Sequence, residues 1–334
     1  MKLNRIFLAL LLCSAANAEQ WQTPKLSWGE PDLQGTWTTA TVTTLERDKA
    51  IDSLVVSEQQ ALAIENFAAG FAESIDELPE GDLPAGKSVG GYNSAWMDPG
   101  TKVLRVDGKP RSSIITEPEN GHVPYTLSGK AKMWWGLLST QKRNNPEELL
   151  LGDRCVVGFG SSGGPPMLPV LYNNNYRFVQ SPNTVVIMVE MNHAARTIRI
   201  GGKPLPPEIR PWLGDSIGYW DGDTLVVETT QFHPQQSVRA AIKHRLYIGT
   251  DTKVVERFTR VSEKEINYQF TIEDEDIYTQ PWKGELTFTP SDGQIYEYAC
   301  HEGNYSLPGI LAGARKADVN GLNWIWSIIK NPPI

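Results

Sequence analysis

Apolar and polar residues alternate strictly in Glu265-Ile266-Asn267-Tyr268-Gln269-Phe270-Thr271. Successive side chains of a β-strand point to opposite faces of the sheet, so this pattern predicts a strand whose three apolar side chains face a core. The same alternation returns in residues 282–288. We therefore expect two strands that each cover the core with one face.

Other strand and turn signals precede and follow this pair. Asp221-Gly222 stands between residues 217–220 and 225–229, which predicts a tight hairpin. Residues 185–189 are continuously apolar and predict a strand buried on both faces. Residues 291–293 read Ser-Asp-Gly and predict a further turn.

Two segments have the periodicity of amphipathic helices, residues 57–72 and 128–142. Ser57 is the expected N-cap of the first, and Ile64 and Phe67 lie on its expected apolar face. We therefore expect helices to be inserted among the strands.

From about residue 176 to residue 300 the chain reads as consecutive antiparallel strands. A sheet of this kind hides its edges by closing on itself or by doubling over. We expect one mainly β domain over residues 19–334, an antiparallel barrel or sandwich of lipocalin-like character with helical insertions. The sequence leaves barrel and sandwich both open.

The composition excludes several classes of protein. The chain has 334 residues, 40% hydrophobic and 21% charged, with a formal net charge of −8. This apolar content is too high for a disordered chain. The acidic balance offers no basic surface to nucleic acid or anionic lipid, and no apolar stretch is long enough to span a bilayer. We expect no nucleic-acid partner and no membrane span.

The N-terminus has the three parts of a secretory signal peptide. Lys2 and Arg5 supply positive charge, residues 6–13 are apolar, and Ala16-Asn17-Ala18 supplies small residues for cleavage. We assign residues 1–18 to the signal and expect the mature protein to be periplasmic or secreted.

Two cysteines remain after the signal is removed, Cys155 and Cys300. An even pair in an oxidising compartment favours a disulfide bond between them. The alternative is two buried free thiols.

Several motifs carry a resemblance to known sequences. They are Pro31-Asp32-Leu33-Gln34-Gly35-Thr36-Trp37, Glu190-Met191-Asn192-His193-Ala194-Ala195-Arg196, Trp212-Leu213-Gly214-Asp215-Ser216 and the segment 296–305, YEYACHEGNY. Over most of the mature chain the sequence resembles a large group of uncharacterised exported proteins from Gram-negative bacteria. This resemblance implies secretion and one shared fold, and it implies no particular activity. Gly35-Thr36-Trp37 is also similar to the first strand of lipocalins.

The familiar cofactor motifs are missing from the sequence. Residues 158–164 are rich in glycine, but Pro165-Pro166 follows where a phosphate-binding helix should begin. The five histidines are widely spread, so a zinc site would have to be assembled from distant segments. We expect neither a metal nor a cofactor.

The densest group of reactive side chains is His301-Glu302-Gly303-Asn304-Tyr305, directly after a predicted strand that ends at Cys300. It offers a base, a carboxylate, an amide and a phenol where a strand leaves a rigid scaffold. The alternative is a turn in which His301 and Asn304 satisfy backbone groups.

Two further groups lie near predicted strand ends or loops. His193 and Arg196 follow the apolar strand 185–189, and Arg196 is suited to bind an anionic or polar group. The alternative is an ion pair between Arg196 and Glu190 that stabilises a turn. Residues 92–98 mix aromatic, amide and carboxylate side chains, which suits a sugar or a flat ligand.

Proton transfer is the chemistry that these side chains can support together. The expected catalytic residues are His301, His193, Glu302 and Tyr305, and the expected substrate-binding residues are Arg196, Asn304, Tyr92, Asn93, Trp96 and Asp98. The resulting hypothesis is an exported lyase or hydrolase acting on a carbohydrate or other polar small molecule. The alternative is a non-catalytic lipocalin-like protein that binds a hydrophobic or aromatic ligand.

Overall fold

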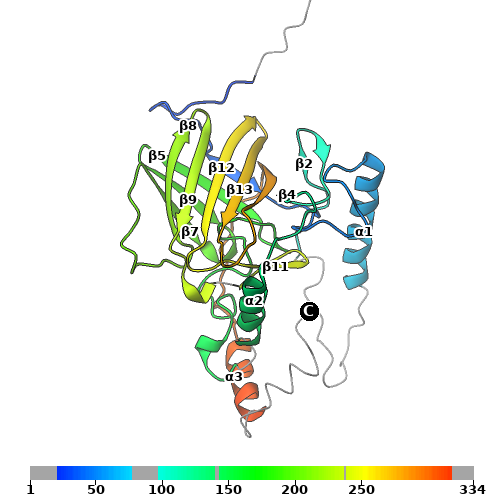
Figure 1. Ribbon diagram of the computed structural model, residues 1–334, viewed down its shortest axis with the longest axis vertical. Coiled ribbons are helices and arrows are strands. Elements are labelled where there is room, and N and C mark those ends of the chain that lie inside the picture. The colour runs from blue at the N-terminus through cyan, green and yellow to red at the C-terminus, as the bar shows by residue number, and fades with distance from the viewer. Residues whose placement is uncertain (1–20, 77–96, 140–142, 237, 318–334) are drawn as a thin grey trace, which may run out of the picture.

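The computed structural model describes residues 21–76, 97–139, 143–236 and 238–317 (Figure 1). The predicted signal peptide lies outside these residues. The helices and strands are β1 (Gly35–Thr38), α1 (Glu58–Asp76), β2 (Arg105–Val106), β3 (Lys109–Pro110), β4 (Ile115–Glu117), α2 (Leu127–Ser139), β5 (Asn175–Ser181), β6 (Thr184–Val189), β7 (Ala195–Ile200), β8 (Asp215–Asp221), β9 (Thr224–Thr230), β10 (Val238–Ala241), β11 (His244–Tyr247), β12 (Lys253–Ser262), β13 (Glu265–Glu273), β14 (Trp282–Pro290) and α3 (Ser306–Ala317). Short 3-10 turns occur at Pro146–Glu148, Met191–His193 and Pro234–Gln236.

Nine strands form a closed barrel, in the order β1-β5-β6-β7-β8-β9-β12-β13-β14. The barrel closes where β1 pairs with β14, with Trp37 opposite Pro290 and Thr38 opposite Thr289. The short strand β4 pairs with β14 further along the same sheet. Closure removes the exposed edges, so the fold is the barrel rather than the sandwich. The strands are antiparallel except for the pair β7–β8, which is parallel.

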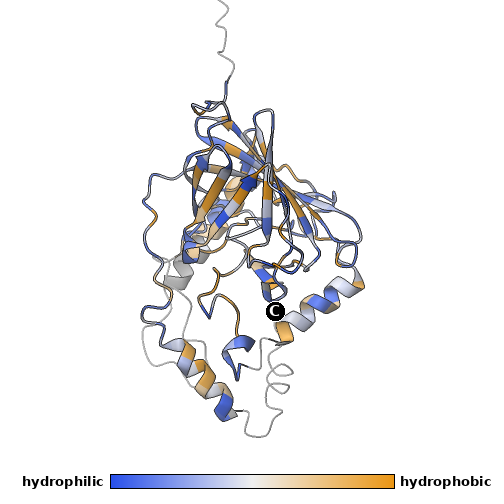
Figure 2. Cartoon of the chain, turned by 90° about the vertical axis from the view of Figure 1, so that its left-hand side faces the viewer, coloured by the Kyte–Doolittle hydropathy of each residue, from blue (hydrophilic) through white to orange (hydrophobic). Residues whose placement is uncertain are grey.

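Aromatic rings fill the inside of the barrel. The buried Phe288 ring lies 5.3 Å from the ring of Tyr176, 5.5 Å from that of Tyr268 and 5.7 Å from that of Phe178. Hydrophobic and polar residues alternate along the strands, as the predicted pattern requires (Figure 2). Gly284 is needed in β14 because a Cβ atom there would collide with the ring of Phe270. The interior is therefore a packed core.

Two predicted strands differ from those observed. In β6 the buried residues alternate with half-buried ones, so the prediction that residues 185–189 are buried on both faces is wrong. A barrel wall has one inner and one outer face, and a second layer would be needed to bury both. Residues 296–300 form no strand. The edges of β14 already pair with β13 on one side and with β1 and β4 on the other, so the chain leaves the barrel after Pro290.

Helices occupy both predicted segments. The Gln60 amide N–H donates to Ser57 Oγ at 3.3 Å, and the Ser57 N–H donates to Gln60 Oε1 at 2.9 Å, so Ser57 caps α1 as expected. The predicted apolar face is wrong at Phe67, which is 69% exposed, whereas Glu65 is buried and pairs with Lys102 at 2.8 Å. Helices α2 and α3 lie at one end of the barrel, and α1 stands beside it (Figure 1). In the described part of the chain, no helix combines the length and apolar character needed to cross a membrane.

The glycine-rich segment packs against β10, and the residues that follow it contact the barrel. The Ser161 N–H donates to the Ala240 carbonyl at 2.9 Å, and the Met167 N–H donates to the Tyr268 hydroxyl at 3.0 Å. Arg239 donates to the Pro165 carbonyl at 2.6 Å, and burial lowers the pKa of Arg239 to about 9. The Ser161 N–H is therefore engaged in packing and is not free to bind a phosphate.

Candidate functional site

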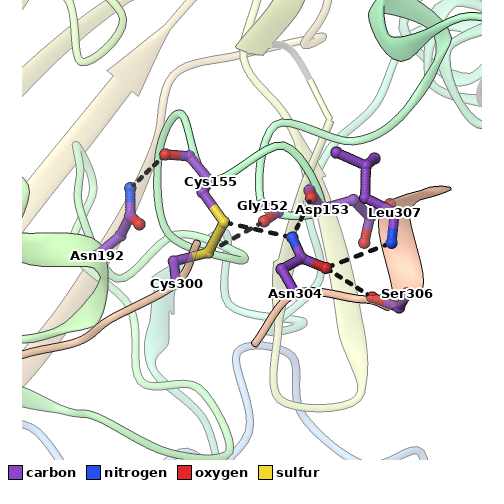
Figure 3. Close-up of a disulfide and its surroundings, with 8 residues drawn as sticks. All are labelled: Gly152, Asp153, Cys155, Asn192, Cys300, Asn304, Ser306 and Leu307. Atoms are coloured by element: carbon purple, nitrogen blue, oxygen red, sulfur yellow. Dashed lines mark hydrogen bonds between the residues drawn. A yellow bond between two sulfur atoms is a disulfide. The ribbon is translucent and has the colours of Figure 1, made fainter. Parts of the chain in front are cut away.

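The two corners predicted to form a site meet around a disulfide bond. Cys155 and Cys300 are bonded at 2.04 Å, which confirms the predicted pair (Figure 3). The Asn192 side chain donates to the Cys155 carbonyl at 3.2 Å. The Tyr298 N–H donates to Nε2 of His193 at 2.6 Å. The corner at residues 190–193 and the segment at residues 298–304 are therefore neighbours.

Asn304, in this corner, forms hydrogen bonds that connect neighbouring segments of the chain. Asn304 Nδ2 donates to the Asp153 carbonyl at 3.5 Å, and its Oδ1 accepts from the Leu307 N–H at 3.4 Å, so Asn304 caps α3 (Figure 3). His301, Glu302 and Tyr305 are exposed. They line neither of the two hollows identified in the described part of the chain.

Removing the disulfide is expected to lower the free energy of unfolding by about 2–4 kcal/mol. The bond closes a loop with a sequence separation of 145, so the unfolded chain gains considerable freedom when it is cut. Urea unfolding of Cys155→Ser/Cys300→Ser, compared with the wild type with and without reductant, measures the loss. The reduced wild type should match the variant, and an oxidised wild type no more stable than either would contradict the expectation.

Arg196 lies inside the barrel rather than at this corner. It is the second residue of β7 and its side chain is 2% exposed. Its Nη1 donates to Glu256 Oε1 at 2.9 Å, and its Nε donates to Ser216 Oγ at 3.1 Å. The Tyr268 hydroxyl donates to the same Glu256 oxygen at 2.7 Å. Arg196 is thus engaged in a buried polar network, and its inward direction follows from the alternation that also buries Ile198.

The third predicted group is only partly described. Tyr92, Asn93 and Trp96 lie outside the described residues. Asp98 is exposed, and its backbone carbonyl accepts from Asn174 Nδ2 at 2.9 Å.

A cluster that the sequence did not indicate brings together Glu46, His122 and His244, and we call it the histidine–carboxylate cluster. Nδ1 of His244 lies 3.3 Å from Glu46 Oε2, and Nδ1 of His122 lies 3.5 Å from the same oxygen. The Val123 N–H donates to the other carboxylate oxygen at 2.8 Å. The three side chains are 23–37% exposed, so they are sheltered but open to solvent.

The electrostatics of the cluster keep Glu46 ionised. Burial alone raises the pKa of Glu46, but the His244 imidazole, the Val123 amide and the His122 imidazole favour the charged form more strongly. The net pKa of Glu46 therefore lies below its ordinary value. A carboxylate that faces Nδ1 of an imidazole sets its orientation and leaves Nε2 for proton transfer.

The geometry of the cluster is that of ion pairs. Within the described ranges, no group of three or more His, Cys, Asp or Glu side chains is arranged to hold a metal ion. Both imidazoles approach one carboxylate oxygen at ion-pair distance.

A hollow of about 480 Å³ adjoins the cluster. Its lining includes Arg47, Asp48, Lys49, Asp52, Glu119 and His122. His122 belongs to both cluster and hollow, so a molecule bound in the hollow would lie next to a histidine oriented by Glu46. A second hollow, of about 440 Å³, lies on the outer side of β12, β13 and β14, among charged residues that pair with one another.

No simple signal in the sequence would have located the cluster. Glu46 lies 76 positions before His122, and His122 lies 122 positions before His244. No local spacing therefore links the three residues. Only the convergence of the segment before α1, the segment before α2 and strand β11 places them together.

Fold and site together define a closed nine-stranded β-barrel that carries a histidine–carboxylate cluster beside an open polar hollow. The chain matches no protein-family model, no curated protein and no solved structure.

Proposed function

We propose that this protein is an exported acid–base enzyme, a lyase or hydrolase acting on a carbohydrate or other polar small molecule. In this proposal Glu46, His122 and His244 transfer the protons, in place of His301 and His193. The observation that carries the proposal is the approach of two imidazoles to one ionised carboxylate at the side of a hollow.

The chemistry follows from the roles of the three groups. The Glu46 carboxylate faces Nδ1 of both imidazoles, so Nε2 of His122 can take a proton from the bound molecule or return it. Charged and polar side chains line the hollow, which suits a polar substrate. Proton transfer of this kind serves hydrolysis and β-elimination alike.

The proposed location is the periplasm or the exterior of the cell. A disulfide bond persists in oxidising compartments and is rare in a reducing cytosol, and the Cys155–Cys300 bond supports export for that reason.

Activity measurements on two histidine variants test the proposal. Wild-type protein is assayed on 4-nitrophenyl glycosides, 4-nitrophenyl esters and short peptides, and on uronate oligomers for elimination products. His122→Ala is expected to lower kcat/KM by about 10²–10⁴-fold, because it removes the proton-transferring group. The control is His301→Ala, whose exposed side chain should be dispensable.

Three results would contradict the proposal. They are no turnover by the wild type, an unchanged kcat/KM in a folded His122→Ala, and an equal loss in His301→Ala. The last result would favour a catalytic site at residues 301–305, as the sequence predicted.

The alternative of a lipocalin-like binding protein has less support. Such a protein holds its ligand inside the barrel, and here aromatic side chains such as Phe178, Phe258 and Phe288 occupy that space. A ligand retained in native mass spectra of the purified protein would favour this alternative.

A further inference from the structure

Arg47 is a buried cation with no carboxylate beside it. Its side chain lines the hollow and the residue is 6% exposed. Nη1 donates to the backbone carbonyls of Asp52 at 3.2 Å and Glu119 at 2.8 Å, and Nε has no hydrogen-bond partner. Among the described residues, no carboxylate forms an ion pair with it. A buried charge is costly unless it is paired, as Arg196 is by Glu256. The wall of the hollow therefore holds a guanidinium that has no ion-pair partner among the described residues.

The surrounding backbone holds Arg47 in place. The Arg47 N–H donates to the Gly121 carbonyl at 3.0 Å. Gly121 has φ +71°, and a Cβ atom there would lie 2.8 Å from Arg47 Cβ and 3.1 Å from Nε. Only glycine permits this close approach, so the turn at residues 118–121 lies directly against the guanidinium. A cation fixed in advance loses little entropy when it binds a ligand.

The rim of the hollow has the opposite charge. Asp48, Asp52 and Glu119 are exposed and line it, together with a single exposed lysine, Lys49. A ligand that carries only negative charge would meet these three carboxylates on its way to Arg47. A ligand that carries only positive charge would leave Arg47 unpaired. Both features are satisfied by a molecule that carries a carboxylate and an ammonium group.

We propose that the hollow binds a small zwitterion, with its carboxylate on Arg47 and its ammonium group among Asp48, Asp52 and Glu119. An amino acid or a short peptide has this chemistry. The inference rests on the proposed function, since it names the substrate class for the same hollow, in which His122 would act on the bound molecule.

Calorimetric titration with three matched dipeptides tests the zwitterion site. The probes are dialanine, N-acetyl-dialanine, which lacks the ammonium charge, and dialanine amide, which lacks the carboxylate. Dialanine is expected to bind about tenfold or more tightly than either of the others, because only it engages both charges. Equal affinities for the three probes, or no binding of dialanine, would overturn the inference.

Arg47→Met and Asp52→Asn locate the two charges, and Arg257→Met is the control. Arg47→Met should weaken dialanine binding to the level of the amide, and Arg257→Met, at the second hollow, should leave it unchanged. Because Arg47→Met removes a buried side chain, Asp52→Asn is measured as well, at an exposed position. It should weaken dialanine and the amide and spare N-acetyl-dialanine. Dialanine binding that neither folded variant weakens would place the ligand elsewhere and overturn the inference.

Binding and catalysis can fail separately. Loss of turnover in His122→Ala together with equal affinities for the three probes would retain the acid–base enzyme and remove the zwitterion. Tight, Arg47-dependent binding of dialanine with unchanged turnover in His122→Ala would retain the zwitterion site and remove the proposed role of His122 in catalysis.

Discussion

Glu256→Gln is expected to lower the free energy of unfolding by about 3–5 kcal/mol. The side chains of Glu256 and Arg196 are 0% and 2% exposed, and Glu256 neutralises the guanidinium from inside the barrel. Glutamine keeps the size of the side chain but removes the charge, so Arg196 would remain as an uncompensated buried cation. The Tyr268 hydroxyl donates to the same carboxylate, and burial, followed by the Glu256 charge, raises the pKa of Tyr268 well above its ordinary value.

Urea unfolding measures this loss, and an exposed pair provides the control. Lys283 and Glu117 form an ion pair at 3.0 Å with side chains 49% and 60% exposed, so Glu117→Gln should cost less than about 1 kcal/mol. The double variant Arg196→Met/Glu256→Gln removes both charges and should be more stable than Glu256→Gln alone. If Glu256→Gln costs no more than Glu117→Gln, the buried pair does not hold the barrel together as argued.

Much of the fold could be predicted, because each strand of the barrel has one face towards the core and one towards solvent. Apolar and polar residues therefore alternate along the sequence of the strand. Strands β13 and β14 and the hairpin β8–β9 were predicted on this basis, and all are present. The parallel pair β7–β8 could not be predicted, since the direction of pairing depends on the path of the intervening chain. The predicted strand at residues 296–300 is absent for a similar reason. They have a plausible strand pattern, but no edge of β14 is left to pair with them.

The candidate site could be predicted less well, because it depends on which distant side chains meet. The disulfide was predicted, since only two cysteines remain after the signal. The corners at residues 190–193 and 298–304 do meet. Arg196 does not join them, because side chains alternate along β7 and that of Arg196 points into the core. His122 and His244 were visible only as two of five scattered histidines. Glu46 had no signal at all, because its role depends on two histidines that are remote in sequence.

Glu46→Gln is expected to lower kcat/KM by about 10²–10⁴-fold on any substrate that the wild type turns over. The carboxylate orients both imidazoles through Nδ1, and a neutral amide neither balances a charged imidazole nor fixes which nitrogen carries the proton. Glu302→Gln is the matched control, since Glu302 is an exposed glutamate that the sequence placed in the catalytic group. Its kcat/KM should stay at the wild-type value, and the opposite ranking of the two variants would favour the corner at residues 301–305.

The pH dependence of stability gives Glu46→Gln a second signature. The pKa of Glu46 lies below its ordinary value of 4.5, because its imidazole and amide neighbours outweigh the effect of burial. The ionised carboxylate therefore stabilises the fold above its pKa in the unfolded chain, and this contribution is lost as the pH falls through the lowered pKa of the folded state. Glutamine resembles the protonated acid at every pH. The wild type should therefore be more stable than the variant at about pH 5, and the difference should shrink towards about pH 3. A difference in the free energy of unfolding that is the same at both pH values would show that the ionised form of Glu46 is not what the two histidines stabilise.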